Sequence, residues 1–320
     1  MWGMKRSVNK FLLLILVFVI IVLCLLNNRY EMFALNFPKG GVKEEGSIRV
    51  MTYNINATLG RNEPTVILSE ILDAVEKHNP DIVCLQELSY PVFSKIKNPL
   101  DSLFGYSDSM SIKKEKFRYY LYAKKPISNF TRYKCLTEID TLGFDSITKL
   151  EVRQRKKHMP VYSADIEIEP DKWITVFVCH LRSSAYSTAR RLMDEDTSWK
   201  DGIPLYYENY KIGQKIRNWE ADNLRIHLEA LEAENTPVII AGDFNDWSGS
   251  YCMNTIRDGK FKDAWWEGGF GFGITYDEWH LKLRLDHILY SHHFMLENVY
   301  VEKSKFSDHR PLIADFKQIE

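Results

Sequence analysis

The chain has 320 residues, of which 42 are basic and 43 acidic, so its net charge of -1 provides no overall field that would attract nucleic acid. This balance still allows a local basic patch, and the length suits one large α/β domain or two small ones. The five cysteines are widely spaced and contain no Cys-x-x-Cys pair, which argues against a zinc site or a disulfide framework and favours buried free thiols.

The N-terminus is the most hydrophobic part of the chain. Basic residues precede an apolar run over residues 11–26, which is short for a membrane-spanning helix and long for a signal-peptide core. No small-residue cleavage site follows, and Leu23 does not fit the residue expected before a lipidated Cys24. We favour an uncleaved signal anchor over residues 1–29, with a cleaved signal peptide as the alternative. The basic flank predicts a single-pass membrane protein whose remaining part lies outside the cytoplasm.

Residues 30–46 contain glycine, proline and scattered charge, and are predicted to be a linker to one domain over residues 47–320. Alternation predicts a strand over 47–55, apolar spacing predicts an amphipathic helix over 65–78, and a second strand covers 82–85. Strand, helix and strand with short joins form a βαβ unit, so both strands should share one sheet.

Further elements follow along the chain. Strands are predicted over 117–123, 161–168, 173–179, 238–241, 285–290 and 311–316, with a long helix over 211–233. The stretch from Arg182 to about Tyr207 has no clear period and is predicted to be an irregular lid. No repeat or second linker is visible, which favours a single domain.

The stretch after the strand over 238–241 carries a pattern of chemical interest. Gly242 lets the backbone turn, so Asp243 and Asn245 fall just past the carboxyl end of the strand and can point the same way. A charged oxygen for a water or metal beside a neutral donor for a phosphate oxygen suits phosphoester chemistry. An Asx turn that closes the strand is the structural alternative.

Polar residues recur where other predicted strands begin or end, the positions at which α/β sheets collect ligands and catalytic groups. They are Asn54, Gln86, Glu87, His180, Asp243, Asn245, Asp286, Ser307, Asp308 and His309. Carboxylate and amide oxygens without paired cysteines favour Mg²⁺ or Mn²⁺ over zinc.

These blocks together resemble a known family. They are Met51-Thr52-Tyr53-Asn54-Ile55, Leu85-Gln86-Glu87, His180-Leu181, Gly242-Asp243-Phe244-Asn245, Arg284-Leu285-Asp286-His287-Ile288 and Ser307-Asp308-His309-Arg310-Pro311. In this order they resemble the endonuclease/exonuclease/phosphatase superfamily with its DNase I-like fold, here as a membrane-anchored member of bacterial type. The resemblance implies a four-layer α/β sandwich, with two mixed β-sheets packed face to face and helices outside. It also implies metal-dependent hydrolysis of a phosphoester by water.

The resemblance assigns roles near the metal and the water. Glu87 resembles the principal metal ligand, and Asn54 and Asp308 resemble residues close to the metal. Asp243 resembles the group that orients or activates the water, and Asn245 the group that binds a phosphate oxygen. As a structural alternative, Asp308 caps the turn before the last strand.

It assigns roles to the histidines as well. His309 resembles the essential histidine, as base or as stabiliser of the pentacovalent centre, with Asp286 holding its ring. His180 resembles the second histidine, which donates to a phosphate oxygen or the leaving group. The alternatives are a strand-end salt bridge for Asp286 and a buried core histidine for His180. His287 should face away from Asp286 on its strand, and Arg182 is either a phosphate ligand or a solvated loop residue.

The sequence departs from the family at two places. Ala123-Lys124-Lys125-Pro126-Ile127 stands where many members have a Ser-Lys-Tyr-Pro-Ile-like strand start, so the extra catalytic group before that strand is not assigned. Leu88 rather than an arginine follows Glu87, which weakens a duplex-DNA interpretation.

Two further stretches bear on the substrate. The basic run over 153–158 suits a polyanion or a lipid surface, or else is a solvated strand edge. The aromatic stretch over 265–279 is either core or a wall that contacts substrate.

Three hypotheses follow. The first is a membrane-anchored phosphodiesterase or phosphatase, expected to be a monomer, whose substrate is a small molecule, a lipid head group or a nucleic acid. The second is an exported Mg²⁺-dependent nuclease. The third is a catalytically silent binding module, which the full set of polar positions disfavours.

Overall fold

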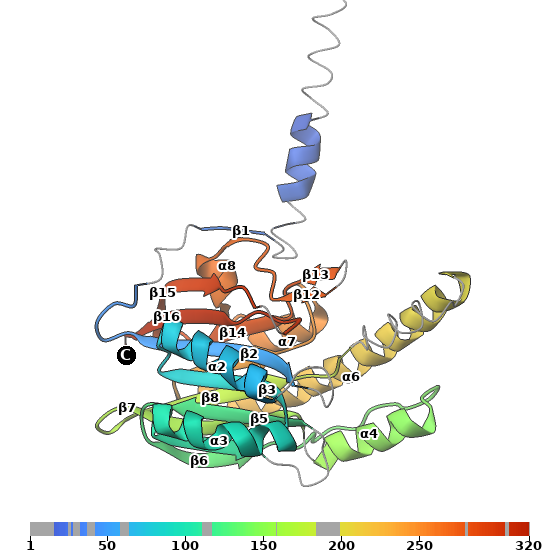
Figure 1. Ribbon diagram of the computed structural model, residues 1–320. Coiled ribbons are helices and arrows are strands. Elements are labelled where there is room, and N and C mark those ends of the chain that lie inside the picture. Colours follow the sequence, from blue (N-terminus) through green and yellow to red (C-terminus); the bar gives the residue numbers. More distant parts are fainter. Residues whose placement is uncertain are drawn as a thin grey trace, which may run out of the picture.

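The computed structural model describes residues 16–24, 27, 33–36, 42–57, 64–110, 117–157, 159–183, 199–278, 281–304 and 307–319. Its body is built on two six-stranded sheets (Figure 1). The first contains, in spatial order, β15 (Phe294–Val301), β16 (Leu312–Gln318), β2 (Ile48–Ala57), β3 (Ile82–Ser89), β5 (Phe117–Ala123) and β4 (Tyr106–Met110). The second contains β10 (Lys262–Asp263), β14 (Asp286–Tyr290), β9 (Val238–Asp243), β8 (Lys172–His180), β7 (Val161–Glu169) and β6 (Ile127–Arg132). Both sheets are mixed, because β2–β3 and β8–β9 pair in parallel and the other neighbours are antiparallel.

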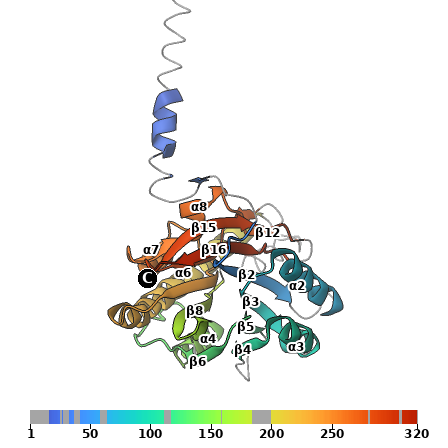
Figure 2. The same cartoon turned by 90° about the vertical axis from the view of Figure 1, so that its left-hand side faces the viewer.

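The two sheets pack face to face, with helices on both outer sides. The core between them draws Val50 and Leu121 from the first sheet and Val176 and Ile239 from the second. Helices α2 (Pro64–His78) and α3 (Tyr90–Phe104) pack on the outer face of the first sheet. Helices α6 (Trp199–Ala233) and α7 (Tyr251–Arg257) pack on the outer face of the second (Figure 2). The predicted α/β sandwich of two mixed sheets is therefore confirmed.

Strand β9 shows why the sequence folds this way around the site. It lies between β8 and β14, and its side chains alternate between two cores: Ile239 faces the core between the sheets and Ile240 the core under α6. Burying one such side chain contributes about 1.5–3 kcal/mol, so a run of apolar residues is stable only as a central strand. The strand therefore presents Asp243 at its carboxyl end with little freedom.

Two sequence expectations need correction. The helix predicted over 211–233 begins at Trp199, and its first part extends beyond the sheets (Figure 1). This first part contains Pro204, and because proline usually interrupts a helix the sequence did not reveal it; residues 184–198 of the predicted lid lie outside the described residues. The basic run lies at the end of helix α4 (Ser146–Lys157) instead of on a strand edge, and Arg155 there pairs with Glu151 and Glu220.

Part of the predicted linker packs against the domain. Strand β1 (Ala34–Leu35) pairs antiparallel with β11 (Phe270–Gly271), which follows the short helix α8 (Ala264–Gly268), and Ala34 is only 2% exposed. Within the predicted anchor, residues 16–24 are helical, whereas residues 11–15 lie outside the described part. Among the residues with described structure, no helix is long and apolar enough to cross a membrane.

Candidate active site

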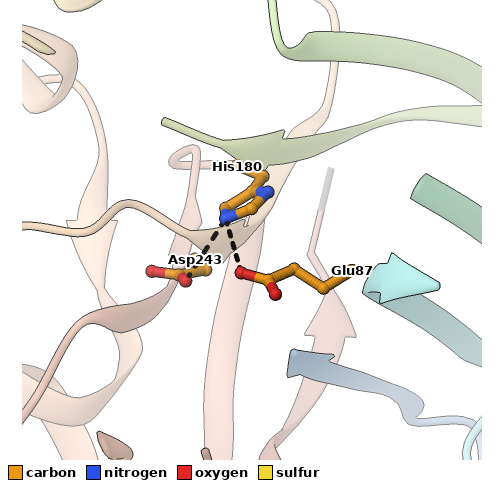
Figure 3. A group of neighbouring side chains, drawn as sticks. All are labelled: Glu87, His180 and Asp243. Atoms are coloured by element: carbon orange, nitrogen blue, oxygen red, sulfur yellow. Dashed lines mark ion pairs between the residues drawn. The ribbon is translucent and has the colours of Figure 1, made fainter. Parts of the chain in front are cut away.

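Polar side chains from both sheets converge at the rim where β3, β8 and β9 end. Glu87, His180 and Asp243 project toward one another from three different strands (Figure 3). His180 Nε2 lies 3.4 Å from Glu87 Oε1 and 3.7 Å from Asp243 Oδ2. The packing of the sheets thus unites residues that are far apart in the sequence.

Glu87 reaches the rim through an irregularity of its strand. The pairing of β3 with β5 shifts between Leu85 and Leu88, and Glu87 adopts a left-handed φ of 58°. A non-glycine residue in this region costs about 1–3 kcal/mol, so the surrounding structure must impose the conformation. Bulges re-aim side chains, and this one turns the Glu87 carboxylate toward the second sheet.

Asn54 at the end of β2 bridges the two sheets. Its fully buried amide Nδ2 donates to Glu87 Oε1 at 3.1 Å and to Asp243 Oδ2 at 2.9 Å. Its Oδ1 accepts the backbone N–H of Asn56 at 3.0 Å, which fixes the orientation of the amide. Asn54 thereby holds two carboxylates at a common point.

The two carboxylate oxygens of Asp243 have different partners. Oδ1 accepts the backbone N–H of Asn245 at 2.8 Å, which is the Asx turn considered above, while Oδ2 faces Asn54 and both histidines. The structural and functional interpretations of Asp243 are therefore compatible. Gly242 is required here, since an added Cβ would lie 2.0 Å from the Cys179 carbonyl oxygen of β8.

Asn245 lies beside this turn. Its side-chain Nδ2 donates to the Leu181 carbonyl at 3.1 Å, so one of its two N–H groups ties the loop after β9 to the loop after β8.

His309 approaches Asp243 from the other side. Its Nδ1 lies 2.7 Å from Asp286 Oδ2, and its Nε2 lies 3.7 Å from Asp243 Oδ2. Asp286 is fully buried and stands opposite Asp243 in the pairing of β14 with β9. A carboxylate on Nδ1 selects the tautomer and directs Nε2 into the site. Tyr276 packs edge-on against the ring of His309 at 5.0 Å.

The structure places Asp308 beside Asn56. Asn56 Nδ2 donates to Asp308 Oδ1 at 2.6 Å. The neighbouring Ser307 hydroxyl donates to the Asn54 carbonyl at 2.8 Å and accepts the His309 backbone N–H at 3.0 Å, so this turn orients His309. Within the described chain, Asp308 belongs to neither of the side-chain groups that could hold a metal.

Arg182 does not point into this cluster. Its Nε lies 3.0 Å from Glu151 on α4, and its backbone N–H donates to Glu220 on α6 at 2.9 Å. His287 faces away from Asp286, as expected, with Nδ1 2.8 Å from Asp263.

Sequence reasoning missed a buried support beneath the site. Arg217 on α6 is fully buried; its Nη1 donates to the Arg182 carbonyl at 2.8 Å and its Nε to Asp246 at 3.2 Å. It therefore braces the loop that follows His180 and the loop that follows Asn245. An arginine placed next to Ile216 on the apolar face of a helix is the signal that could have revealed it.

Charges within the cluster shift its pKa values. Burial acts to raise the pKa of Glu87, but the hydrogen bond and charge of His180 outweigh it and lower this pKa to about 2. Burial acts to lower the pKa of His309, yet the charges of Asp286 and Asp243 raise it to about 10. Burial raises the pKa of Asp243; the charge of His309 opposes this and the charge of Asp286 adds to it.

A hard divalent cation fits this arrangement. Two groups, Glu87–His180–Asp243 and Asp243–Asp286–His309, each have ligand atoms within 4.8 Å of one another. Asp286 is engaged by His309 Nδ1, so Glu87 and Asp243, which both accept from the Asn54 amide, are the carboxylates better placed to hold an ion. Burial raises the pKa of Asp243, and a cation held at this point would favour its ionised form. Oxygen donors of this kind suit Mg²⁺ or Mn²⁺.

A cavity of about 570 Å³ lies at the opposite end of the sheets. It is lined by residues at the starts of β2 and β3 and in the β7–β8 turn, among them Ile48, Asp81 and Lys172. None of the predicted site residues lines it.

Comparisons with known proteins place this arrangement in context. No curated protein matches the sequence. The fold is similar to the human Nocturnin catalytic domain with a bound sulfate anion (TM-score 0.60, 20% identity, 87% of this chain and 96% of that chain). It is similar to D. rerio TDP2 complexed with a single-strand DNA product (TM-score 0.59, 15% identity, 85% and 99%). It is also similar to ANGEL2, described as a 2′,3′-cyclic phosphatase, in complex with adenosine-2′,3′-vanadate (TM-score 0.57, 15% identity, 85% and 96%).

These likenesses concern the fold, whereas the sequence itself matches a family model over residues 51–309. Because that match runs from β2 to His309 and includes every residue of the converging cluster, the chain belongs to the Endonuclease/Exonuclease/phosphatase family.

Proposed function

We propose that this protein is a Mg²⁺- or Mn²⁺-dependent phosphoester hydrolase, anchored in a membrane with its catalytic domain outside the cytoplasm. The observation that carries the hydrolase part is the convergence of Glu87 and Asp243, from strands of opposite sheets, with His309 from the turn before β16. Family membership and the phosphate-related ligands named for its structural neighbours support it.

The proposed roles follow from the contacts. Glu87 and Asp243, with Asn54 beside them, would hold the metal ion, which supplies positive charge to offset charge growing on the phosphate. Asp243 Oδ2 orients the attacking water, because it lies 3.7 Å from Nε2 of both His180 and His309. Asp308, one residue before His309, lies near the metal in this scheme.

The remaining groups bind the phosphoryl oxygens. His309, held by Asp286, directs Nε2 toward the reacting phosphorus, either as base or as a donor to the pentacovalent centre. His180 Nε2 donates to a non-bridging oxygen or to the leaving group. Asn245 uses its remaining N–H group for a phosphate oxygen.

The membrane location rests on the sequence. The apolar run over 11–26, its basic flank and the absence of a small-residue cleavage site in the printed sequence support an uncleaved anchor with the domain outside. We also propose that the protein is a monomer.

An exported nuclease is the second candidate. It is favoured by the likeness to D. rerio TDP2 in complex with a single-strand DNA product. The net charge of -1 and the presence of Leu88 after Glu87 argue against duplex DNA as substrate.

The test is turnover by the full chain in detergent. Bis(p-nitrophenyl) phosphate, a lipid phosphodiester and plasmid DNA are compared with Mg²⁺, with Mn²⁺ and with a chelator. We expect metal-dependent turnover that His309→Ala abolishes, whereas the matched control His292→Ala, at an exposed turn, leaves it unchanged. Faster nicking of DNA than hydrolysis of the other two would favour the nuclease, and no turnover by folded, metal-bound protein would favour the silent module.

A further inference from the structure

An exposed apolar surface lies where the N-terminal segment joins the catalytic domain. In strands β1 and β11, Leu35 is 70% exposed and Phe270 is 47% exposed, and Phe272 just beyond β11 is 54% exposed. We call the surface formed by Leu35 and these two phenylalanines the aromatic platform. Its strands pair with Ala34 opposite Gly271 and Leu35 opposite Phe270, so the backbone that carries the platform is a built part of the fold.

The platform is fastened to the end of the apolar run. Asn27, directly after that run, donates from Nδ2 to the Phe33 carbonyl at 2.7 Å and accepts the Phe33 backbone N–H on Oδ1 at 2.6 Å. The ring of Phe33 packs edge-on against Phe272 at 4.9 Å and against Phe270 at 5.9 Å. The side chain of Asn27 therefore links the end of the apolar run to the backbone of Phe33.

A second pair of contacts locks the segment that follows. The Asn36 backbone N–H donates to the Gly269 carbonyl at 3.0 Å, and Asn36 Nδ2 donates to the Trp266 carbonyl at 3.1 Å. With these bonds the segment over 33–36 acts as a clamp. Through Phe33 it joins the platform to Asn27, the residue that follows the apolar run.

The platform is also joined to the catalytic site. Phe272 and Tyr276 are four residues apart, which limits their Cα atoms to about 14 Å. Tyr276 packs on His309, and the Thr275 hydroxyl accepts the backbone N–H of Asp286 at 3.0 Å. The platform is therefore joined by a short stretch of chain to residues that contact the catalytic groups.

We propose that the aromatic platform docks on the surface of the lipid bilayer that holds the apolar run, and that the substrate is the phosphoester head group of a lipid in that bilayer. The inference rests on the proposed hydrolase function and deepens it. We choose a lipid surface as the partner because Leu35 of the platform follows the apolar run closely in the chain. In addition, exposed phenylalanine and leucine side chains lower their free energy when they leave water for the interfacial region of a bilayer. A domain that is held against the bilayer keeps its active site at the level of the lipid head groups. A domain on a flexible linker would spend most of its time away from the membrane surface.

Depth labelling tests the docking. The full chain with Cys24→Ser loses its exposed thiol, since the other four cysteines are buried. Leu35→Cys in this background carries the environment-sensitive fluorophore NBD in vesicles of phosphatidylcholine and phosphatidylglycerol. The matched control is Lys172→Cys at the exposed start of β8. We expect blue-shifted emission and quenching by brominated lipids at position 35 only; equal, water-like emission at both positions overturns the docking.

Kinetics test the substrate class. Phe270→Ser with Phe272→Ser should lower turnover of a vesicle-embedded lipid phosphodiester at least about tenfold and leave turnover of bis(p-nitrophenyl) phosphate unchanged. Phe272→Trp, which keeps an aromatic ring, should retain both activities. Equal loss on both substrates, or no loss on vesicles, overturns the inference. Wild-type protein inactive on every phosphoester contradicts the proposed function itself, whereas full activity on the soluble ester without a vesicle effect contradicts only the inference.

Discussion

The contact between Asp286 and His309 offers the sharpest test of the proposed chemistry. Asp286→Asn keeps the size and shape of the side chain and removes its charge. The bond that it alters is short, at 2.7 Å, and fully buried, so no water can replace the lost carboxylate oxygen. The asparagine can also present its N–H₂ group to Nδ1, which would favour the wrong tautomer of the ring.

The size of the effect follows from the bond. A hydrogen bond to a charged group contributes about 1.5–3 kcal/mol, which corresponds to a fall in kcat of about ten- to 150-fold. A reversed tautomer would deepen the loss to about 10⁴-fold, the order of magnitude seen when the aspartate of a Ser-His-Asp triad is replaced by asparagine. KM should change little, because Asp286 lies behind His309 and does not touch the substrate.

The assay is steady-state hydrolysis of bis(p-nitrophenyl) phosphate, with urea unfolding to confirm the fold. Asp315→Asn is the matched control: Asp315 is an equally buried carboxylate, paired with Arg49 at 2.6 Å away from the cluster. It should lower stability and leave kcat of the folded enzyme unchanged. If Asp286→Asn retained wild-type kcat, or if both variants lost activity in proportion to stability, His309 would not depend on Asp286 for catalysis.

Other perturbations give equally direct outcomes. Gly242→Ala places a Cβ 2.0 Å from the Cys179 carbonyl and should destabilise by about 3 kcal/mol in urea unfolding; unchanged stability would contradict the close approach of β8 and β9. Glu87→Gln should weaken Mg²⁺ binding at least about tenfold, as measured by calorimetry. An unchanged affinity would mean that the metal binds at other residues. Burial opposes the ionisation of Asp263, yet Arg284 and the neighbouring histidine hold its pKa well below the ordinary value. The stability it adds is thus present above about pH 4 and lost as pH falls further. Thermal unfolding of Asp263→Asn should show a weaker pH dependence in that range than wild type.

Local patterns in the sequence predicted the elements that carry the site. The apolar run of β9 and the amphipathic spacing of α2 each reflect a buried face, and such faces leave a period in the sequence. Helical segments that contain a proline escaped prediction, because proline usually interrupts a helix: α3 contains Pro99, and the first part of α6 contains Pro204. The pairing of β1 with β11 joins residues far apart in the sequence. Each strand has only two residues, which is too few to show the alternation of apolar and polar residues that predicts a strand.

The sequence by itself determined which residue types stand at the strand ends, because strand ends and turns are local features. Only the tertiary structure decided where those side chains point. Glu87 enters the cluster through a left-handed bulge, Arg182 turns away toward Glu151, and Asp308 is engaged by Asn56. These directions depend on the register between strands and on the packing of one sheet against the other, which join residues from opposite ends of the chain and follow no local pattern.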